Sequence, residues 1–175
     1  MNREDIPMLK NNPNLIYFDN GATTLKPKSV IKSINNYYSN YCANAHRGDY
    51  KISAKVDEAY ELVRKKISQF IGAKESSEVI FTSGTTDSLN RIVFGYFKNN
   101  LQEGDEVLLT ESEHASNILP WFILQEKIGI KIKYIPLDDN NEVTIENIKK
   151  ILTDKTKVIS LAYITNVIGD IRPIR

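Results

Sequence analysis

Short apolar runs alternate with amphipathic segments of helical length through the second half of the chain, and this order constrains the fold most strongly. The apolar runs that indicate strands are 78–82, 106–110, 131–136 and 157–163. The segments that indicate helices between them are 87–97, 117–128 and 144–152. Strands and helices in this order form βαβ units with right-handed crossovers. The sequence therefore predicts an α/β fold with a mostly parallel sheet flanked by helices.

The first half of the chain shows a different pattern. The apolar run 15–18 precedes an Asp-Asn-Gly turn, which is typical of a strand that ends in a loop. Two segments with helical spacing follow, one beginning near Pro27 and a longer one beginning near Ser53. We expect residues 1–20 to form an N-terminal extension with the first strand, and residues 21–175 to form a large domain. Because the chain stops after a strand without a covering helix, we expect this domain to be incomplete.

Charge and hydrophobicity narrow the functional classes. The chain has 23 basic and 22 acidic side chains and no basic stripe interleaved with aromatic residues, so we expect no nucleic-acid partner. No run of about 18 apolar residues is present, and the charged N-terminus resembles no signal peptide, so we expect no membrane association. Cys42 is the single cysteine and cannot form an internal disulfide. We therefore expect a cytoplasmic protein.

A loop between an expected strand and an expected helix has the composition of an anion site. It contains Gly84, Thr85 and Thr86. Free backbone N–H groups at a helix N-terminus and the positive end of the helix dipole attract phosphate, and glycine lets the backbone approach it closely. The sequence matches no Walker A pattern. The alternative is that a threonine here only caps the helix.

Two further polar residues follow expected strands. His114 comes after the strand at 106–110, and Asn166 comes after the last strand. Ligands of open α/β sheets lie at the carboxyl ends of strands, so we expect both residues at the same edge as the anion loop. An imidazole there can stack on an aromatic cofactor or move protons. The alternatives are a solvated loop histidine and a turn asparagine before a glycine bend.

Two polar loops in the first half are weaker candidates. One contains Ala22 and Thr23, and the other contains His46 and Arg47. Taken alone, the first indicates a turn with a helix cap, and the second indicates a solvated surface loop. Two histidines and one cysteine at these spacings fit no zinc pattern, so we expect no metal site. The chain also has no G-x-S-x-G elbow of a serine hydrolase.

These segments together, in their order along the chain, resemble the N-terminal half of cysteine desulfurases. The similarity is greatest to the Suf-type branch of the class V aminotransferase-like enzymes of fold type I, and it extends from about Leu15 onward. The segments that carry it are 17–24, 44–48, 81–86, 111–121 and 165–169.

The resemblance implies a cofactor, a reaction and partners. Members of this family bind pyridoxal 5′-phosphate, act as homodimers, and convert L-cysteine to alanine while an enzyme persulfide retains the sulfur. A sulfur-acceptor protein then takes the sulfur for iron–sulfur cluster or other sulfur assembly. The large domain expected at 21–175 would be the cofactor-binding domain.

The resemblance also implies roles for individual residues. Gly84, Thr85 and Thr86 match the segment that holds the cofactor phosphate. His114 matches the histidine that stacks on the pyridine ring and assists proton transfer. Asn166 matches the asparagine near the cofactor hydroxyl and the substrate. The remaining matches are Ala22 and Thr23 in a loop on the substrate side, and His46 and Arg47 near the site entrance and dimer contact.

Departures from the family pattern leave the substrate branch open. Ser83 stands where the family often has arginine, and Ala115 and Tyr163 stand where it often has histidine. Another class V reaction is therefore an alternative, namely that of a selenocysteine lyase, a kynureninase-like enzyme or an aminotransferase. In the family, the lysine that binds the cofactor covalently and the persulfide cysteine lie further along. We thus expect no desulfurase activity from this chain alone, and a non-catalytic scaffold is a further alternative.

Overall fold

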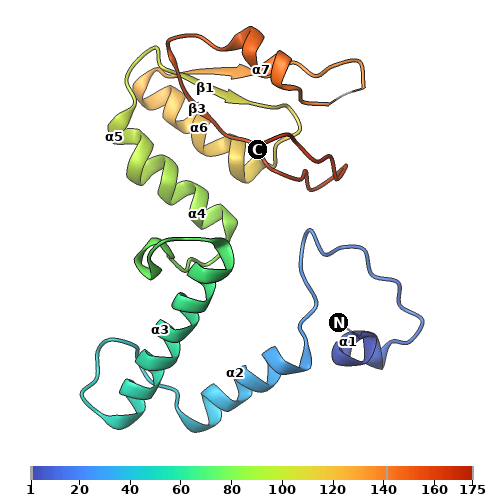
Figure 1. Cartoon of the computed structure of the whole chain (residues 1–175), viewed down its shortest axis with the longest axis vertical. Coiled ribbons are helices and arrows are strands. Elements are labelled where there is room, and N and C mark those ends of the chain that lie inside the picture. Colours follow the sequence, from blue (N-terminus) through green and yellow to red (C-terminus); the bar gives the residue numbers. More distant parts are fainter. Residues whose placement is uncertain (1, 141, 175) are drawn as a thin grey trace. The chain divides into compact units, whose positions relative to one another are not determined.

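The computed structural model describes residues 2–140 and 142–174, and the chain divides into two compact units, Met1–Ile80 and Phe81–Arg175 (Figure 1). Each unit has its own set of elements and is described by itself.

The first unit is helical in the residues that the structure describes. Two helices in it are long, and both lie close to where their spacing predicts them. Its elements are η1 (Arg3–Asp5), α1 (Pro7–Asn11), α2 (Lys28–Asn40), α3 (Lys51–Ile71) and η2 (Ser76–Glu78). Helix α3 ends at Gly72, whose φ of 74° permits the left-handed cap that closes the last turn.

Two strands that the sequence predicts are not formed. Residues 15–18 and 78–82 pair with no strand within the described part of the chain. A strand needs a neighbour that accepts and donates its backbone hydrogen bonds, and an apolar run alone supplies none. Phe18 and Ile80 accordingly remain 91% and 78% exposed. The boundary between the two units also falls within the second of these segments.

The second unit contains a parallel sheet of three strands within the described residues, in the order β2-β1-β3. The strands are β1 (Glu106–Leu109), β2 (Lys131–Tyr134) and β3 (Thr156–Ile159). In register, Val107 lies opposite Ile132 on one side and Val158 on the other. The prediction of an α/β fold with a mostly parallel sheet flanked by helices is confirmed.

Helices cover both faces of this sheet. They are α4 (Thr85–Arg91), the π-helical segment η3 (Ile92–Phe97), α5 (Lys98–Asn100), α6 (Ala115–Ile128) and α7 (Ile145–Ile151). The first three of these follow one another without a break. Figure 1 shows α6 and α7 on opposite sides of the strands.

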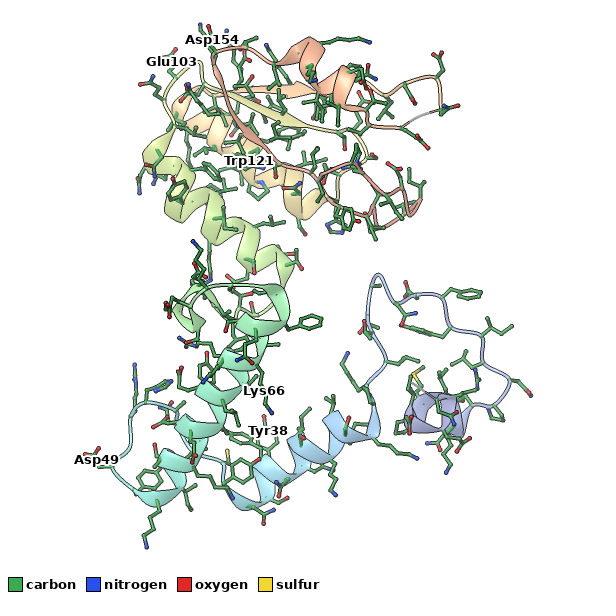
Figure 2. The ribbon with its side chains drawn as sticks, viewed as in Figure 1. Tyr38, Asp49, Lys66, Glu103, Trp121 and Asp154 are labelled. Atoms are coloured by element: carbon green, nitrogen blue, oxygen red, sulfur yellow. The ribbon has the colours of Figure 1, made fainter. Side chains whose placement is uncertain are left out.

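Alternation along β1 divides the core into two clusters, because successive side chains of a strand point to opposite faces. Val107 and Leu109 pack with Trp121 and Leu124 of α6, and Trp121 lies in the interior of the unit (Figure 2). Leu108 packs on the other face, in a cluster that α7 partly covers. All three β1 side chains are fully buried, so this strand fixes the centre of the unit.

Candidate functional site

The strand order of the second unit reverses between β1 and β3. From β1 the chain passes through α6 to β2 on one side, and it then returns through α7 to β3 on the other side of β1. The loops that leave the carboxyl ends of β1 and β3 therefore diverge. Ligands of open α/β sheets bind at such a reversal of strand order. His114 lies on the first of these loops and Asn166 on the second.

The anion loop lies at the start of α4. Gly84 precedes the helix with a φ of 153°, a conformation that side chains with a Cβ rarely adopt. No side chain caps this helix, and Thr85 and Thr86 are exposed. The first backbone N–H groups of an α-helix have no partner within the helix. They are therefore available here to an anion, and the two threonine hydroxyls stand beside them.

Asp87 organises this loop from the first turn of α4. Its carboxylate accepts hydrogen bonds from the backbone N–H and the hydroxyl of Ser83, both at 3.2 Å, and from Arg91 Nε at 2.8 Å. The Ser83 N–H and the Arg91 guanidinium hold the pKa of this carboxyl below its usual range. The charge of Asp87 is thus engaged within the protein, which reduces its repulsion of a phosphate. Sequence reasoning missed this residue, although its spacing of four from Arg91 is a recognisable helical pair.

His114 begins α6 as its N-cap residue. Its side chain accepts a hydrogen bond at Nδ1 from the backbone N–H of Ser116, at 3.1 Å. The neutral ring therefore carries its proton on Nε2. His114 is exposed, so its imidazole is accessible to a ligand.

A hydroxyl pair joins the anion loop to the start of α6. Thr86 Oγ1 lies 2.8 Å from Ser116 Oγ, and α4 packs along α6. Ser116 also donates its backbone N–H to His114. The structure thus brings Thr86 and His114 to neighbouring helix starts through one shared residue.

Asn166 lies in an exposed turn at the tip of a narrow hairpin after β3. A bridge between Ile164 and Ile171 closes the hairpin, and the N–H of Thr165 donates to the carbonyl of Asp170 at 3.1 Å. The backbone N–H of Asp170 in turn donates to the Thr165 hydroxyl at 3.0 Å. The turn that carries the amide is therefore held at its base.

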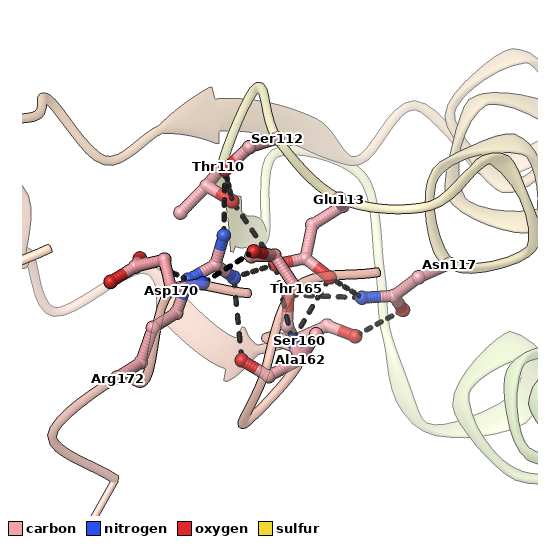
Figure 3. A network of polar contacts seen from close by, with 9 residues as sticks. All are labelled: Thr110, Ser112, Glu113, Asn117, Ser160, Ala162, Thr165, Asp170 and Arg172. Atoms are coloured by element: carbon pink, nitrogen blue, oxygen red, sulfur yellow. Dashed lines mark hydrogen bonds and ion pairs between the residues drawn. The ribbon is translucent and has the colours of Figure 1, made fainter. Parts of the chain in front are cut away.

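A buried polar network under this edge is the largest feature that the sequence did not reveal. Figure 3 shows Glu113 bonded to Asn117 and Arg172 within it. Glu113 directly precedes His114, but its partner Arg172 follows 59 residues later, and no local pattern connects the two. Only the presence of a charged residue beside His114 was visible in the sequence.

The four remaining candidates belong to the first unit. The N–H groups of Ala22 and Thr23 donate to the carbonyl of Asp19 at 3.2 and 3.1 Å, which makes the expected turn. The Tyr17 hydroxyl donates to the Thr23 carbonyl at 2.6 Å. Ala22 and Thr23 are both exposed, and they are neighbours within this turn.

His46 is held more firmly than a solvated loop residue. It adopts a φ of 62°, which is uncommon for a residue with a side chain. Its Nδ1 lies 3.6 Å from Asp57 and its Nε2 lies 3.5 Å from Glu61, and its ring meets Tyr60 edge-on. All three partners come from α3. Arg47 beside it is exposed.

Along residues 2–140 and 142–174, none of the helices combines the length and apolar character that a membrane crossing requires.

The family model for aminotransferase class-V matches residues 16–175. A probable cysteine desulfurase from Vibrio cholerae is 41% identical over 167 residues, which are 95% of this chain and 41% of that protein. A probable cysteine desulfurase from a Synechocystis strain is 37% identical over 98% of this chain. The chain spans about 41% of the length of these two relatives.

Solved structures show the same fold. The apo structure of a cysteine desulfurase from Thermococcus onnurineus superposes with a TM-score of 0.89 and is 37% identical, covering 98% of this chain and 42% of that one. A cysteine desulfurase from Escherichia coli superposes with a TM-score of 0.85 at 28% identity, again over 98% of this chain and 42% of that one.

Proposed function

Because this chain belongs to the aminotransferase class-V family, we propose that it is the cofactor-phosphate-binding part of a pyridoxal 5′-phosphate-dependent cysteine desulfurase. The whole enzyme would take L-cysteine, release alanine, and pass the sulfur through an enzyme persulfide to a sulfur-acceptor protein. It would belong to the Suf-type branch and would act as a homodimer. Support comes from relatives named probable cysteine desulfurase that are 37–41% identical over 95–98% of this chain.

The observation that carries the proposal is the contact between Thr86 and Ser116. This pair of hydroxyls, 2.8 Å apart, sets an anion-binding helix start beside the exposed ring of His114. Pyridoxal phosphate has a phosphate at one end and a flat aromatic ring at the other. A site for it therefore needs these two features close together.

The residues of this edge fit the cofactor. Apart from its chain neighbours, no residue has an atom within 4 Å of where a Cβ of Gly84 would stand, so a phosphate has room to approach the backbone. The open N–H groups and the hydroxyls of Thr85 and Thr86 supply donors to it. His114 supplies a flat surface for the ring, and Asn166 supplies an amide for the ring hydroxyl and the substrate.

Each residue has a separate role in the proposed mechanism. Bound pyridoxal phosphate supplies an electron-withdrawing ring that stabilises negative charge on a substrate carbon. Thr85 and Thr86 bind the phosphate, and Asp87, already paired with Arg91, leaves the helix dipole free to attract it. His114 orients the ring through stacking and holds a proton at Nε2, because its Nδ1 accepts from Ser116.

The first unit would contribute to the substrate side of the enzyme. Ala22 and Thr23 would line the substrate region, and His46 and Arg47 would lie near the entrance and the dimer contact. We further propose that residues 21–175 belong to the large domain, with residues 1–20 as its extension. The 41% coverage of relatives supports the view that the cofactor lysine and the persulfide cysteine lie outside this chain.

The proposal is tested by ligand discrimination. The chain is titrated with pyridoxal 5′-phosphate and with pyridoxal, which lacks the phosphate, and binding is followed by quenching of Trp121 fluorescence and by calorimetry. We expect binding of the phosphorylated compound only. Equal affinity for both compounds, or no binding of either, would contradict the proposed phosphate site.

A second measurement addresses the reaction. Alanine release from L-cysteine is followed for this chain and for the product of the complete reading frame that contains it. We expect release from the complete product and none from the chain. Release of another product from a different amino acid would instead favour one of the other class V reactions.

A further inference from the structure

The carboxylate of Glu113 ties the loop of His114 to four other parts of the second unit. Its two oxygens accept hydrogen bonds from Thr110 Oγ1 at 3.0 Å, Asn117 Nδ2 at 2.9 Å, and the backbone N–H of Ala162 at 3.1 and 3.0 Å. Arg172 Nη1 donates to the same carboxylate (Figure 3). These donors come from the end of β1, from α6, from the segment after β3, and from the last described residues of the chain.

Arg172 holds the base of the hairpin that carries Asn166. Its backbone N–H donates to the carbonyl of Tyr163 at 2.9 Å, and its side chain donates from Nη2 to the Ser112 hydroxyl at 2.7 Å. Nη1 also reaches the carbonyl of Ala162 at 3.4 Å, and Nε lies 3.7 Å from Asp170. One guanidinium thus contacts both arms of the hairpin and the loop before His114.

Burial makes this connection rigid. The side chains of Arg172 and Glu113 are 0% and 1% exposed. A buried charge that loses its partner is strongly destabilised, so neither side chain can leave the pair without a large rearrangement. Asn117 extends the same network, because it also donates to the carbonyl of Ser160 at 3.2 Å and accepts from the Ser160 hydroxyl at 2.6 Å.

We propose that Glu113 and Arg172 are positioning residues that fix the imidazole of His114 relative to the turn of Asn166. Neither side chain is exposed to a ligand, so both act through their neighbours. Glu113 sets the backbone from which His114 projects, and Arg172 sets the hairpin at whose tip Asn166 lies. This inference rests on the proposed function, because it assigns the two positioned groups to the pyridoxal phosphate site.

The test uses Glu113→Gln in the full chain. The amide keeps the shape of the carboxylate but places a donor opposite the donors of Ala162 and Arg172. The matched control is Glu106→Gln, which removes a carboxylate of similar burial at the other end of β1, where it pairs with Lys133 at 2.7 Å. Both variants should lower the melting temperature. A lower melting temperature alone therefore does not show that Glu113 positions His114.

The deciding readout is the imidazole ¹⁵N spectrum. The chain has two histidines, so His46 serves as an internal reference for His114. We expect Glu113→Gln to shift the His114 nitrogens and leave those of His46 unchanged, and to weaken pyridoxal phosphate binding by about tenfold or more. We expect Glu106→Gln to change neither. Unshifted His114 signals in folded Glu113→Gln, or an equal shift in the control, would overturn the proposal.

A second variant covers the case in which Glu113→Gln does not fold. Arg172→Lys is then measured in the same way, because lysine keeps the charge but lacks the forked donors. Shifted His114 signals again support the proposal, and unshifted signals overturn it.

The two proposals fail in different ways. If the unsubstituted chain binds no pyridoxal phosphate while the variant still shifts His114, the positioning geometry holds and the proposed cofactor fails. If the unsubstituted chain binds pyridoxal phosphate and the variant leaves His114 unshifted, the proposed cofactor holds and the positioning role is overturned.

Discussion

The hydroxyls of Thr86 and Ser116 lie 2.8 Å apart although 30 positions separate them in the sequence. This contact joins the starts of α4 and α6, so the anion loop and the imidazole of His114 form one edge of the second unit. The contribution of this contact to the free energy can be measured by substitution, because neither Thr86 nor Ser116 belongs to the two core clusters.

Thr86→Val removes one hydroxyl from the anion loop while keeping the shape of the side chain. Loss of a hydrogen bond to a charged group costs about 1.5–3 kcal/mol, so we expect affinity for pyridoxal phosphate to fall by about tenfold or more. Thr86→Ser should retain most of the affinity. Thr144→Val, which removes the cap of α7, serves as the control: it should lower the melting temperature and leave the affinity unchanged. An unaltered affinity in Thr86→Val would exclude this hydroxyl from the site.

Gly84→Ala tests the backbone of the anion loop. The φ of 153° at this position is strained for alanine, which costs about 1–3 kcal/mol, and the added methyl group occupies the space that a phosphate would use. We expect lower stability in urea denaturation and loss of pyridoxal phosphate binding. Gly95→Ala is the matched control, since its added Cβ meets no side chain other than its chain neighbours within 4 Å and its φ is not positive. That variant should bind normally, and impaired binding there would point to a general effect of the substitution.

The stability of the second unit should depend on pH through Glu106. Hydrogen bonds from Lys133 and then Thr153 lower the pKa of its carboxyl from 4.5 to about 2. A lowered folded-state pKa means that this group stabilises the fold above pH 4.5 and that the contribution is lost as the pH falls toward 2. We expect the urea midpoint to decline through this window. Glu106→Gln should flatten the decline, and an equally steep decline in the variant would assign it to other carboxyls.

Gly48→Ala probes the loop that carries His46. An added Cβ would lie 2.5 Å from Tyr50 Cε1 and 2.8 and 2.9 Å from the buried Ser53 side chain. Tyr50 is exposed and can move, but Ser53 is buried and hydrogen-bonded to the carbonyl of Asn44 at 3.0 Å. Overpacking of this kind costs about 1–3 kcal/mol, so we expect a lower melting temperature and shifted His46 NMR signals. His114 signals should stay in place; unchanged His46 signals would show that the loop yields without cost.

The spacing of apolar residues predicted most helices and strands of the second unit, because that spacing is contained within each segment. The apolar run at 106–110 became β1, and the helical spacing at 117–128 became α6. The order β2-β1-β3 was not predictable, since it depends on pairing between distant segments. The same limit explains the two runs, 15–18 and 78–82, that were wrongly predicted as strands: their apolar character says nothing about a partner.

The residues of the candidate site were likewise predictable only in part. The glycine and threonines before α4 and the histidine before α6 are visible because each stands at a junction between elements. Their roles, and that of Asn166, stay predictions. Arg172 was not predictable as the partner of Glu113, because a buried ion pair across 59 positions has no sequence signature. His46 and Arg47 remain candidates on resemblance alone.

The π-helical segment η3 sets the rotational phase between the two ends of one helix. Each residue of an α-helix advances its side chain by about 100°, and a π-helical turn changes that count locally. Val93 and Phe97 face the core, and Thr86, earlier on the same helix, contacts Ser116. A π-helical turn holds about one more residue than an α-helical turn, so deleting one residue here, such as Gly95, would turn the segment into a regular α-helix. The wide turn of η3 thus lets the helix carry an extra residue between the anion loop and the core.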